Sequence, residues 1–360
     1  MDSPPPAEIR IRDIAFGGNG VGRLDTGAPR GKAAFIPFTI DGELVRVRVT
    51  RERKKFVEAV LEEVLEASPE RVKPRCPYFG DCGGCSYQHI SYDHQLSVKE
   101  RQVEQTLRRV GRFAAVPMVH IVPSPEEYGY RNRIRVHVSG GALGFFAHGS
   151  HRVVDVEHCA IAQDTVNKKL ARLRSSAVPD GDYTLGTNAT THFFEQTNDR
   201  VADAMVRIVR SALPAKGKTL VDAYCGAGYF ARRLLGRFER VIGLEQNASA
   251  VEHARKSATP PETYIAGDVA DTLGPVLSAE DREDLALLLD PPAAGLSPRV
   301  IDTILSIMPP DVVYVSCNPA TLARDLNLLK VGYTLASVTP LDMFPQTAEI
   351  EVVTHLTRIP

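Results

Sequence analysis

The second half of the chain alternates short apolar segments with helical patterns, and this alternation constrains the fold more than any other feature. From residue 193 onward, runs rich in Val, Ile and Leu are separated by turns and amphipathic stretches. Strands are predicted at 219–223, 241–245, 264–268, 285–290, 312–315, 333–340 and 350–356. Strands that alternate with helices are typical of a doubly wound, mostly parallel α/β sheet.

The ends of the first predicted strands carry glycines and acids. The strand 219–223 leads into Gly226-Ala227-Gly228, which lets a helix N-terminus approach a ligand. The next three strands end on acids: Glu245, Asp268 and Asp290. An acid after the second strand can hold ribose hydroxyls, but Ala231 replaces the third glycine of a dinucleotide fingerprint. We therefore expect an adenosyl ligand without a pyrophosphate, S-adenosylmethionine, with NAD as the alternative.

The segment 311–325 (DVVYVSCNPATLARD) predicts a buried strand, a turn and a helix. Asn318 is the expected N-cap, and Pro319 suits the first helical turn. Cys317 is then placed where ligands bind in open α/β sheets, next to a helix N-terminus that favours thiolate over thiol. The alternative is a small apolar cysteine of the core.

Glu351, in DMFPQTAEIE, is a candidate partner for this cysteine. Methyl transfer to a pyrimidine C5 requires a nucleophile that adds to C6 and a base that later removes the C5 proton. Cys317 and Glu351 can supply these two functions. That the two side chains lie close together in the fold is a hypothesis.

The first half of the chain is predicted to bind a polyanion. Residues 7–66 show short alternating strands with Gly-rich turns, which favours an OB-like barrel, a common platform for oligonucleotides. Arg131, Arg133 and Arg135 alternate with apolar residues on a further strand. Residues 1–152 carry more basic than acidic side chains, and residues 153–360 the reverse.

Four of the six cysteines are predicted metal ligands. Cys76, Cys82 and Cys85 have the spacing Cys-x5-Cys-x2-Cys, and Cys159 can complete the set. Four thiolates suit a 4Fe–4S cluster or tetrahedral zinc, and the three-plus-one arrangement favours the cluster. Cys225 is interpreted as a small residue that packs behind the glycine turn.

Seven motifs resemble one known family: CPYFGDCGGCSYQH, YGYRNRIR, FFEQTN, DAYCGAGYF, LDPPAAG, VSCNPATLARD and DMFPQTAEIE. The chain resembles, over nearly its whole length, the RNA 5-methyluridine (uracil-C5) methyltransferases, specifically the 23S rRNA type with an N-terminal TRAM domain and a 4Fe–4S cluster. The resemblance implies a class I (Rossmann-like) S-adenosylmethionine-dependent methyltransferase domain. It implies three regions: a TRAM barrel (1–67), an iron–sulfur loop with a β-rich RNA-binding region (68–192) and the catalytic domain (193–360).

The resemblance also implies roles for individual residues. Cys317 matches the nucleophile, Glu351 the base, and Asp290 the acid near the methyl donor and the flipped uracil. The positions that match the cofactor site are Gln196, Tyr224, Gly226, Gly228, Tyr229, Glu245, Asp268 and Asp290. The positions that match the cluster ligands are Cys76, Cys82, Cys85 and Cys159. Three positions depart from the family pattern: Ala293 stands where Arg is frequent, and Gln346 and Glu349 stand where His is frequent.

The expected substrate is RNA: 23S rRNA, with the tRNA T-loop as the alternative. We expect a cytoplasmic monomer without a protein partner, because the sequence has no apolar run long enough for a membrane span and no secretory signal. Two other functions stay open: an amino-methyltransferase, which the Asp290-Pro291-Pro292 turn permits, and a non-catalytic RNA-binding protein.

Overall fold

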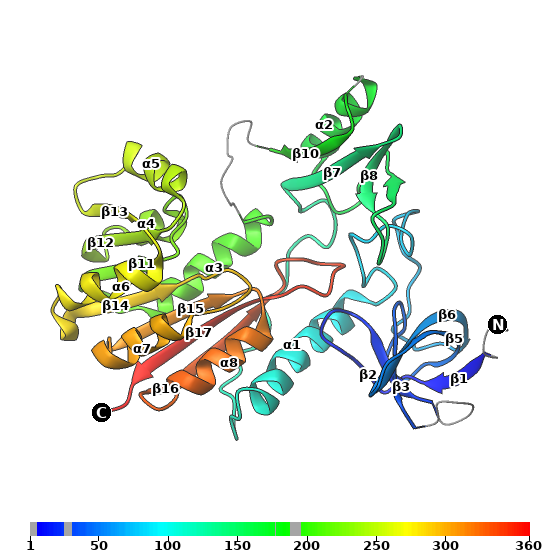
Figure 1. Ribbon diagram of the computed structural model, residues 1–360, viewed down its shortest axis with the longest axis horizontal. Helices are drawn as coiled ribbons and strands as arrows, with labels where there is room; N and C mark the ends of the chain where they lie inside the picture. Colours follow the sequence, from blue (N-terminus) through cyan, green and yellow to red (C-terminus); the bar gives the residue numbers. More distant parts are fainter. Residues whose placement is uncertain (1–5, 25–30, 177, 188–195) are drawn as a thin grey trace. The chain divides into compact units, whose positions relative to one another are not determined.

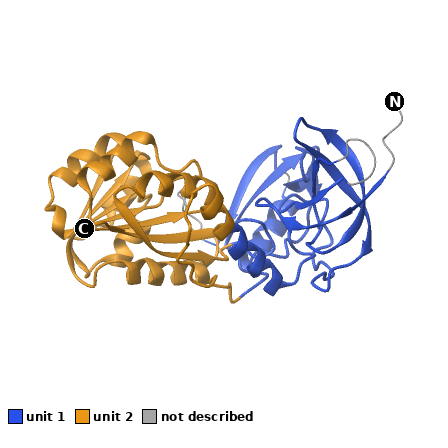
Figure 2. Cartoon of the chain, turned by 90° about the horizontal axis from the view of Figure 1, so that it is seen from below, with its two compact units in different colours: residues 1–102, 126–187, 344–349 blue, residues 103–125, 188–343, 350–360 orange. Residues whose placement is uncertain are grey.

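A computed structural model describes residues 6–24, 31–176, 178–187 and 196–360. The chain forms two compact units, which Figure 2 shows in different colours. Unit 1 consists of Met1–Gln102, Glu126–Thr187 and Phe344–Glu349, and unit 2 of Val103–Pro125, Asn188–Met343 and Ile350–Pro360.

The N-terminal part of unit 1 is a curved sheet, with six strands among the described residues. The strands are β1 (Ala7–Arg10), β2 (Asp13–Ile14), β3 (Gly20–Arg23), β4 (Ala33–Ile36), β5 (Leu44–Glu52) and β6 (Phe56–Glu66), in the order β1-β5-β6-β4-β3-β2. Alternate residues such as Ile9, Val47 and Val57 are buried in one core. The backbone of β1 passes so close to Gly22 that a Cβ there would lie 2.8 Å from the Arg10 carbonyl oxygen. The predicted OB-like barrel is confirmed.

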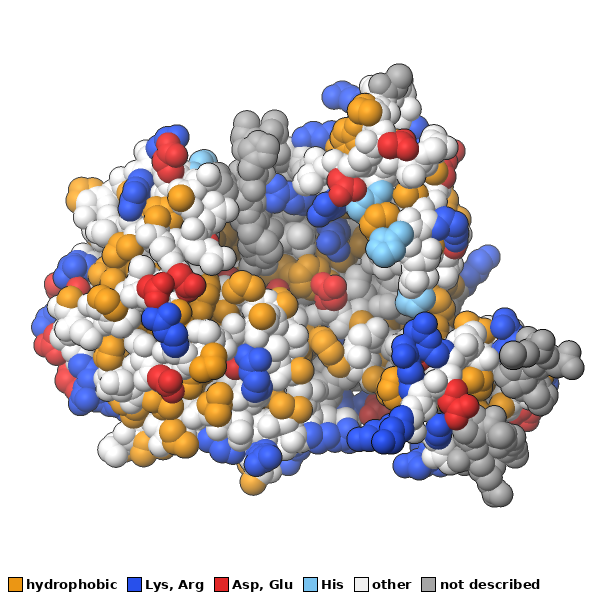
Figure 3. All heavy atoms as spheres, in the orientation of Figure 1, with side chains coloured by type: hydrophobic (Ala, Val, Ile, Leu, Met, Phe, Trp, Pro, Cys, Tyr) orange, Lys and Arg blue, Asp and Glu red, His pale blue; other side chains and the backbone are white. Residues whose placement is uncertain are grey.

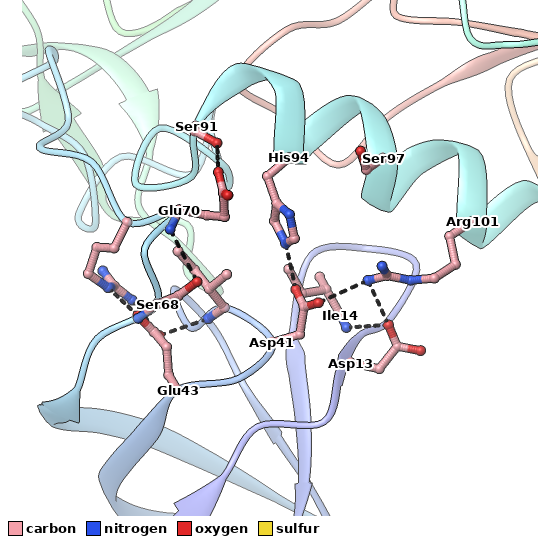
Figure 4. A network of polar contacts seen from close by, with 12 residues as sticks. Asp13, Ile14, Asp41, Glu43, Ser68, Glu70, Ser91, His94, Ser97 and Arg101 are labelled. Carbon is pink, nitrogen blue, oxygen red and sulfur yellow. Dashed lines mark hydrogen bonds and ion pairs between the residues drawn. The ribbon is translucent and has the colours of Figure 1, made fainter.

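A polar network joins this barrel to helix α1 (Tyr92–Arg109), as Figure 4 shows. Asp41 contacts the His94 ring at 2.8 Å and accepts a hydrogen bond from Arg101 at 3.3 Å. The same arginine bonds Asp13 of β2 at 3.1 Å. The polar side of α1 is therefore bonded to the barrel.

A second sheet of unit 1 carries the alternating arginine strand. Its strands are β7 (Arg133–Ser139), β8 (Ala142–Phe146), β9 (Val153–Asp155) and β10 (Gly181–Gly186), in the order β10-β7-β8-β9. Ile134 and Val136 of β7 are buried against Val166 and Leu170 of helix α2 (Asp164–Ser175), and Arg135 between them is exposed. The predicted apolar and basic faces of this strand are therefore present.

Unit 2 is built on a sheet with seven strands in the part of the chain that the structure describes. The strands are β11 (Gly217–Ala223), β12 (Phe238–Glu245), β13 (Glu262–Ala266), β14 (Leu285–Leu289), β15 (Asp311–Ser316), β16 (Tyr333–Leu341) and β17 (Glu351–Arg358). Their order is β13-β12-β11-β14-β15-β17-β16, and only the pairs that include β17 are antiparallel. The predicted doubly wound α/β sheet is confirmed.

Helices cover both faces of this sheet (Figure 1). They are α3 (Asp199–Ala212), α4 (Tyr229–Leu234), α5 (Ala248–Lys256), α6 (Val269–Ser278), α7 (Pro298–Ile307) and α8 (Pro319–Leu329), with a short 3-10 helix η1 (Arg282–Asp284) before β14. Buried residues of α6, α7 and α8 share one core with Val221, Leu287 and Val312 of the sheet. The other face is covered by α3, α4 and α5.

The two units divide the chain differently from the three predicted regions. Val103 and Leu107, at the end of α1, belong to the core of the seven-stranded sheet, so the division falls inside this helix. Residues 344–349 belong to unit 1 although the residues on both sides of them belong to unit 2. The three-region division stays a prediction. Within the described ranges, no helix has both the length and the hydropathy that crossing a membrane requires.

Candidate active site and cysteine cluster

The turn after β11 is shaped for close approach to a ligand. Tyr224, Gly226 and Gly228 all have positive φ angles, of 67°, 54° and 85°. Gly228 is required for a second reason, because a Cβ there would lie 2.5 Å from the Tyr264 hydroxyl. The carboxylate of Glu245, at the end of β12, accepts the Gly226 N–H at 3.0 Å. The predicted glycine turn and the predicted acid are therefore in direct contact.

Two acids behind this turn lie in surroundings that disfavour their charge. Asp222 of β11 is fully buried, and its Oδ2 accepts the Ala231 N–H at 2.9 Å. Its Oδ1 has no hydrogen-bond partner within the described residues. Burial, and then the charge of Asp290, raise the pKa of Asp222 to about 8. Asp290 is only half-buried by surface area, yet desolvation of its carboxyl group raises its pKa to about 7. A bound cation would be stabilised by ionisation of this pair.

Asp222 was missed in the sequence analysis, because it lies inside a strand rather than at its end. The signal was an acid in an otherwise apolar segment, TLVDA. Two strand ends also differ from the prediction: β13 ends at Ala266 and β14 at Leu289, so Asp268 and Asp290 follow their strands instead of closing them. Asp268 is the N-cap of α6, where its side chain accepts the Ala270 N–H at 2.8 Å.

The remaining predicted cofactor residues lie near the starts of helices in unit 2. Tyr229 is the first residue of α4, and the Arg233 guanidinium lies 3.9 Å from its ring centroid. Burial, followed by the charge of Asp268, raises the pKa of Tyr224 to about 12. Gln196 is buried two residues before the N-cap of α3, Asn198. The preceding residues of the FFEQTN motif, 193–195, lie outside the described residues.

Cys317 lies between β15 and α8, as predicted, and is exposed. The Asn318 side chain caps the helix by accepting the N–H groups of Ala320 at 3.0 Å and Thr321 at 3.4 Å. Asn318 and Thr321 side chains also donate to the Ala293 carbonyl oxygen, at 3.2 and 3.0 Å. The turn that carries Cys317 is thus bonded to the loop that follows Asp290.

Asp325 of α8 connects the loop after Asp290 to strand β15, which precedes Cys317. It is fully buried and accepts hydrogen bonds from the Leu296 N–H, the Tyr314 hydroxyl and the Arg324 Nε, each at 2.8 Å. The sequence analysis missed this role, because an acid inside an amphipathic helix is normally solvated. Its residual signal is that Asp325 lies near the apolar face formed by Leu322, Leu326 and Leu329.

The strand register brings the chain segments of Cys317 and Glu351 next to each other. Strands β15 and β17 are antiparallel, and their pairing ends with Ser316 opposite Val352. Cys317 directly follows Ser316, and Glu351 directly precedes Val352, so both residues adjoin this last pair. The chain bends at Cys317, where β15 has ended. Glu351 is buried, with 5% of its surface exposed.

Glu349, the other acid of this motif, is placed differently. It is exposed and belongs to unit 1, and its N–H donates to the Thr347 hydroxyl at 3.2 Å. Only Glu351 is therefore on the strand that pairs with β15.

The four predicted ligand cysteines are gathered in unit 1. Burial, together with the charges of the other cysteines, raises the thiol pKa of Cys82 to about 11 and of Cys85 to about 12. The pKa of Cys159 is also raised, by burial and then by Cys76. Such mutual effects require the thiols to be close. Nevertheless, no three His, Cys, Asp or Glu side chains in the described ranges are arranged to hold one metal ion.

Backbone contacts fix the segment that carries three of these cysteines. The Gly83 N–H donates to the Phe146 carbonyl oxygen at 2.9 Å, and a Cβ at Gly83 would lie 3.0 Å from that oxygen. Asn167 bonds both the N–H and the carbonyl of Cys159, at 2.9 and 3.0 Å. These contacts fix the backbone at Gly83 and at Cys159.

The β7–β8 surface of unit 1 combines basic and aromatic side chains. The His137 ring stacks on Phe146 with centroids 3.7 Å apart, and His151 contacts the same ring edge-on at 5.3 Å. The Arg135 side chain is 67% exposed and pairs with Asp182. Figure 3 shows His side chains gathered over β7 and β8, with Lys and Arg side chains nearby. Stacked rings beside positive charge are typical of single-stranded nucleic acid binding.

Known proteins resemble this chain over nearly its full length. The family described as tRNA (Uracil-5-)-methyltransferase matches residues 279–359, and the TRAM domain matches residues 7–61. An uncharacterized RNA methyltransferase of Bdellovibrio bacteriovorus is 32% identical, with 97% of this chain and 94% of that protein covered. An uncharacterized RNA methyltransferase of Aquifex aeolicus is 28% identical, with 98% of each covered. The crystal structure of Pyrococcus abyssi tRNA (uracil-54, C5)-methyltransferase with S-adenosyl-L-homocysteine has a TM-score of 0.73 and 25% identity, covering 97% of this chain and 99% of that one.

Proposed function

This chain belongs to the S-adenosylmethionine-dependent RNA (uracil-5-)-methyltransferase family, and we propose that it methylates C5 of a specific uridine through a covalent adduct on Cys317. The observation that supports the proposal is the strand register, because the exposed Cys317 and the buried Glu351 adjoin the last pair of β15 and β17, Ser316 with Val352. The reaction needs a nucleophile that reaches C6 and a base that reaches the C5 proton.

The chain's own groups perform the covalent steps. The Cys317 thiolate adds to C6 of the uracil, and the electron pair moves through C5 to the O4 carbonyl. S-adenosylmethionine would supply an electrophilic methyl group to the C5 carbanion that results, and would leave as the neutral thioether S-adenosylhomocysteine when its sulfur–methyl bond breaks. The Glu351 carboxylate then removes the C5 proton, the C5–C6 double bond re-forms, and the bond from C6 to the Cys317 sulfur breaks. The thiol is free again after one turnover, and no oxidant or reductant is needed.

The residues around the glycine turn fit the methyl donor. Gly226 leaves room for a ligand at the backbone, and Glu245, which bonds the Gly226 N–H, can accept ribose hydroxyls. Asp222 and Asp290 supply carboxylates for the sulfonium side, and the unpartnered Oδ1 of Asp222 within the described residues supports a polar ligand there. We place the adenosine against Tyr224, Tyr229, Asp268 and Gln196.

Trapping of the adduct tests the mechanism. With methyl-tritiated S-adenosylmethionine and RNA from a strain that lacks the gene, Glu351→Gln should accumulate tritium on the protein in denaturing gels, because the methylated adduct forms and is not released. The matched control Glu349→Gln should turn over like the wild type. Cys317→Ala should label neither protein nor RNA; full activity of this variant would favour the amino-methyltransferase alternative. Failure to bind S-adenosylmethionine would favour a non-catalytic RNA-binding protein.

We propose 23S rRNA as the substrate, and the cytoplasm as the compartment where that RNA is modified. The TRAM domain together with the cysteine segment supports this proposal through the resemblance noted above. The second candidate is the tRNA T-loop, which the Pyrococcus abyssi structure favours because its protein is a tRNA (uracil-54, C5)-methyltransferase. Mapping 5-methyluridine in rRNA and tRNA of a deletion strain separates the two.

We also propose that Cys76, Cys82, Cys85 and Cys159 hold a 4Fe–4S cluster. Two observations support this proposal: the cysteines raise one another's pKa values, and four soft thiolates are the ligands that such a cluster takes. Anaerobically purified protein should bind about four irons and absorb broadly near roughly 400 nm. Stoichiometric zinc without iron would show a tetrahedral zinc site instead.

A further inference from the structure

The segment 344–349, which leads into the strand of Glu351, is held by unit 1. Met343 before it and Ile350 after it belong to unit 2, so this short loop leaves and rejoins that unit within a few residues (Figure 2). Glu351 follows only two residues after the loop ends. The position of the loop is therefore covalently coupled to the position of the proposed base.

Three successive carbonyl oxygens of this loop accept hydrogen bonds from buried groups of unit 1. Phe344 O accepts from the Lys99 ammonium at 3.1 Å, and Pro345 O accepts from the Tyr130 hydroxyl at 2.9 Å. Gln346 O accepts two N–H groups, from Ser86 at 3.1 Å and Tyr87 at 2.9 Å. Lys99 and Tyr130 are 0% and 1% exposed. We call Lys99, Tyr130 and Gln95, with the N–H groups of residues 86 and 87, the loop clamp.

Gln95 completes the clamp by bonding Gln346 twice. The Gln346 N–H donates to Gln95 Oε1 at 3.0 Å, and Gln95 Nε2 donates to Gln346 Oε1 at 3.1 Å. Gln346 has a φ of 70°, a left-handed conformation that costs about 1–3 kcal/mol for a residue with a side chain. The surrounding contacts must therefore impose this conformation, which indicates a loop fixed in one arrangement.

The end of the loop is packed as tightly as its beginning. Ala348 belongs to one buried cluster with Ile14 and Ile40 of the barrel and Val98 of α1. A Cβ added to Gly18 would lie 3.2 Å from the Ala348 Cβ. The RNA-binding barrel, helix α1 and the segment directly after Cys85 thus all contact the loop.

We propose that the loop clamp positions Glu351 for proton abstraction, so that the barrel and the cysteine segment control release of the methylated RNA rather than its methylation. This inference rests on the proposed function. The addition of Cys317 and the methyl transfer do not use Glu351, whereas the elimination does. A loosened clamp should therefore slow the second half of the reaction selectively, and the methylated adduct should accumulate.

The chain offers a matched pair of variants. Tyr130→Phe removes the hydroxyl that donates to Pro345 O at 2.9 Å, and Tyr333→Phe removes a hydroxyl that donates to Pro309 O at 3.0 Å. Both tyrosines are buried and both acceptors are proline carbonyls, but Tyr333 is in unit 2 and does not bond the loop. Loss of one such bond corresponds to about a fivefold change in a rate or equilibrium constant. Lys99→Met, which removes the donor to Phe344 O, serves as a second variant.

The experiment follows tritium from labelled S-adenosylmethionine into the protein band and into free RNA. We expect Tyr130→Phe to slow release about fivefold without slowing the first labelling, Lys99→Met to act in the same direction, and Tyr333→Phe to behave as the wild type. Wild-type release in Tyr130→Phe, in Lys99→Met and in the double variant would overturn the inference. If Glu351→Gln itself does not accumulate label, the proposed mechanism fails instead, so the two failures are distinguishable.

Discussion

The buried acids Asp222 and Asp290 lead to a testable difference between two ligands that differ by one charge. Both carboxyl groups have raised pKa values, about 8 and about 7, because the protein desolvates them. S-adenosylmethionine is a sulfonium cation near the methyl group, and S-adenosylhomocysteine is a neutral thioether there. Ionised carboxylates favour the cation, so we expect its affinity to rise with pH while that of the thioether stays nearly constant.

The magnitude follows from the ionised fraction of Asp290. With a pKa of about 7, about one-tenth of this carboxyl is ionised near pH 6 and about nine-tenths near pH 8. If only the ionised form binds the sulfonium well, the apparent affinity changes by about tenfold across this range. Asp222, with its pKa of about 8, adds to the effect at the upper end of the range. Binding should also release protons, because the cation lowers both pKa values.

Calorimetry with both ligands at several pH values measures this directly. Titration in two buffers of different ionisation enthalpy gives the number of protons released. Asp290→Asn should flatten the pH dependence for S-adenosylmethionine and leave that for S-adenosylhomocysteine unchanged. Equal pH profiles for the two ligands in the wild-type protein would refute the placement of these acids beside the sulfonium.

Three further predictions concern the framework of the site. Gly228→Ala should abolish measurable S-adenosylmethionine binding, because the φ of 85° and a tyrosine hydroxyl 2.5 Å from the new Cβ both oppose a side chain there. Gly226→Ala has open space around the new Cβ, so it should lower the free energy of unfolding by only about 1 kcal/mol of backbone strain, which equilibrium unfolding measures. Asp325→Asn should lower the free energy of unfolding by about 1–3 kcal/mol, because it leaves a buried donor without an acceptor. If that donor is the Tyr314 hydroxyl, Asp325→Asn should cost much less when Tyr314→Phe is already present. The pKa of Asp222 is higher in the folded state than in the unfolded state, so its contribution to stability is present at low pH and is lost as the pH rises towards about 8. Asp222→Asn should therefore show a smaller fall in Tm than the wild type between about pH 5 and about pH 8.

Local sequence chemistry was sufficient for the elements that carry the site. Asn318 was expected as an N-cap because it precedes Pro319 and an apolar helical pattern, and its side chain does cap α8. The strand before Cys317 and the glycine turn after β11 were equally local, since each depends on neighbours within a few residues. The seven strands of the sheet follow from apolar runs that are too regular for loops.

Contacts between segments that are distant in the chain could not be predicted from local sequence patterns. The register that brings the segments of Cys317 and Glu351 next to each other depends on β17 entering the sheet antiparallel beside β15, which no periodicity encodes. Asp222 and Asp325 looked like ordinary polar positions, because their burial results from packing by other elements. Asp268 and Asp290 were assigned to the right edge of the sheet, but a strand boundary is set by hydrogen bonding to its neighbours, so each strand ended earlier than expected.

The position of Gln346 shows how a departure from a family pattern can be explained by the fold. The residue stands where His is frequent in the family, only five positions before the proposed base. Its side chain is buried, and Gln346 Oε1 accepts a hydrogen bond from Gln95 Nε2, while the backbone N–H of Gln346 donates to Gln95 Oε1. A histidine at this position would keep the backbone bond, but its acceptor nitrogen sits in a rigid ring whose shape differs from that of the glutamine side chain that Gln95 Nε2 bonds. We therefore expect Gln346→His to weaken the loop clamp unless Gln95 is also changed, with slower adduct release in the single variant. Unchanged release in Gln346→His would mean that the backbone bonds of the clamp hold the loop without this side chain.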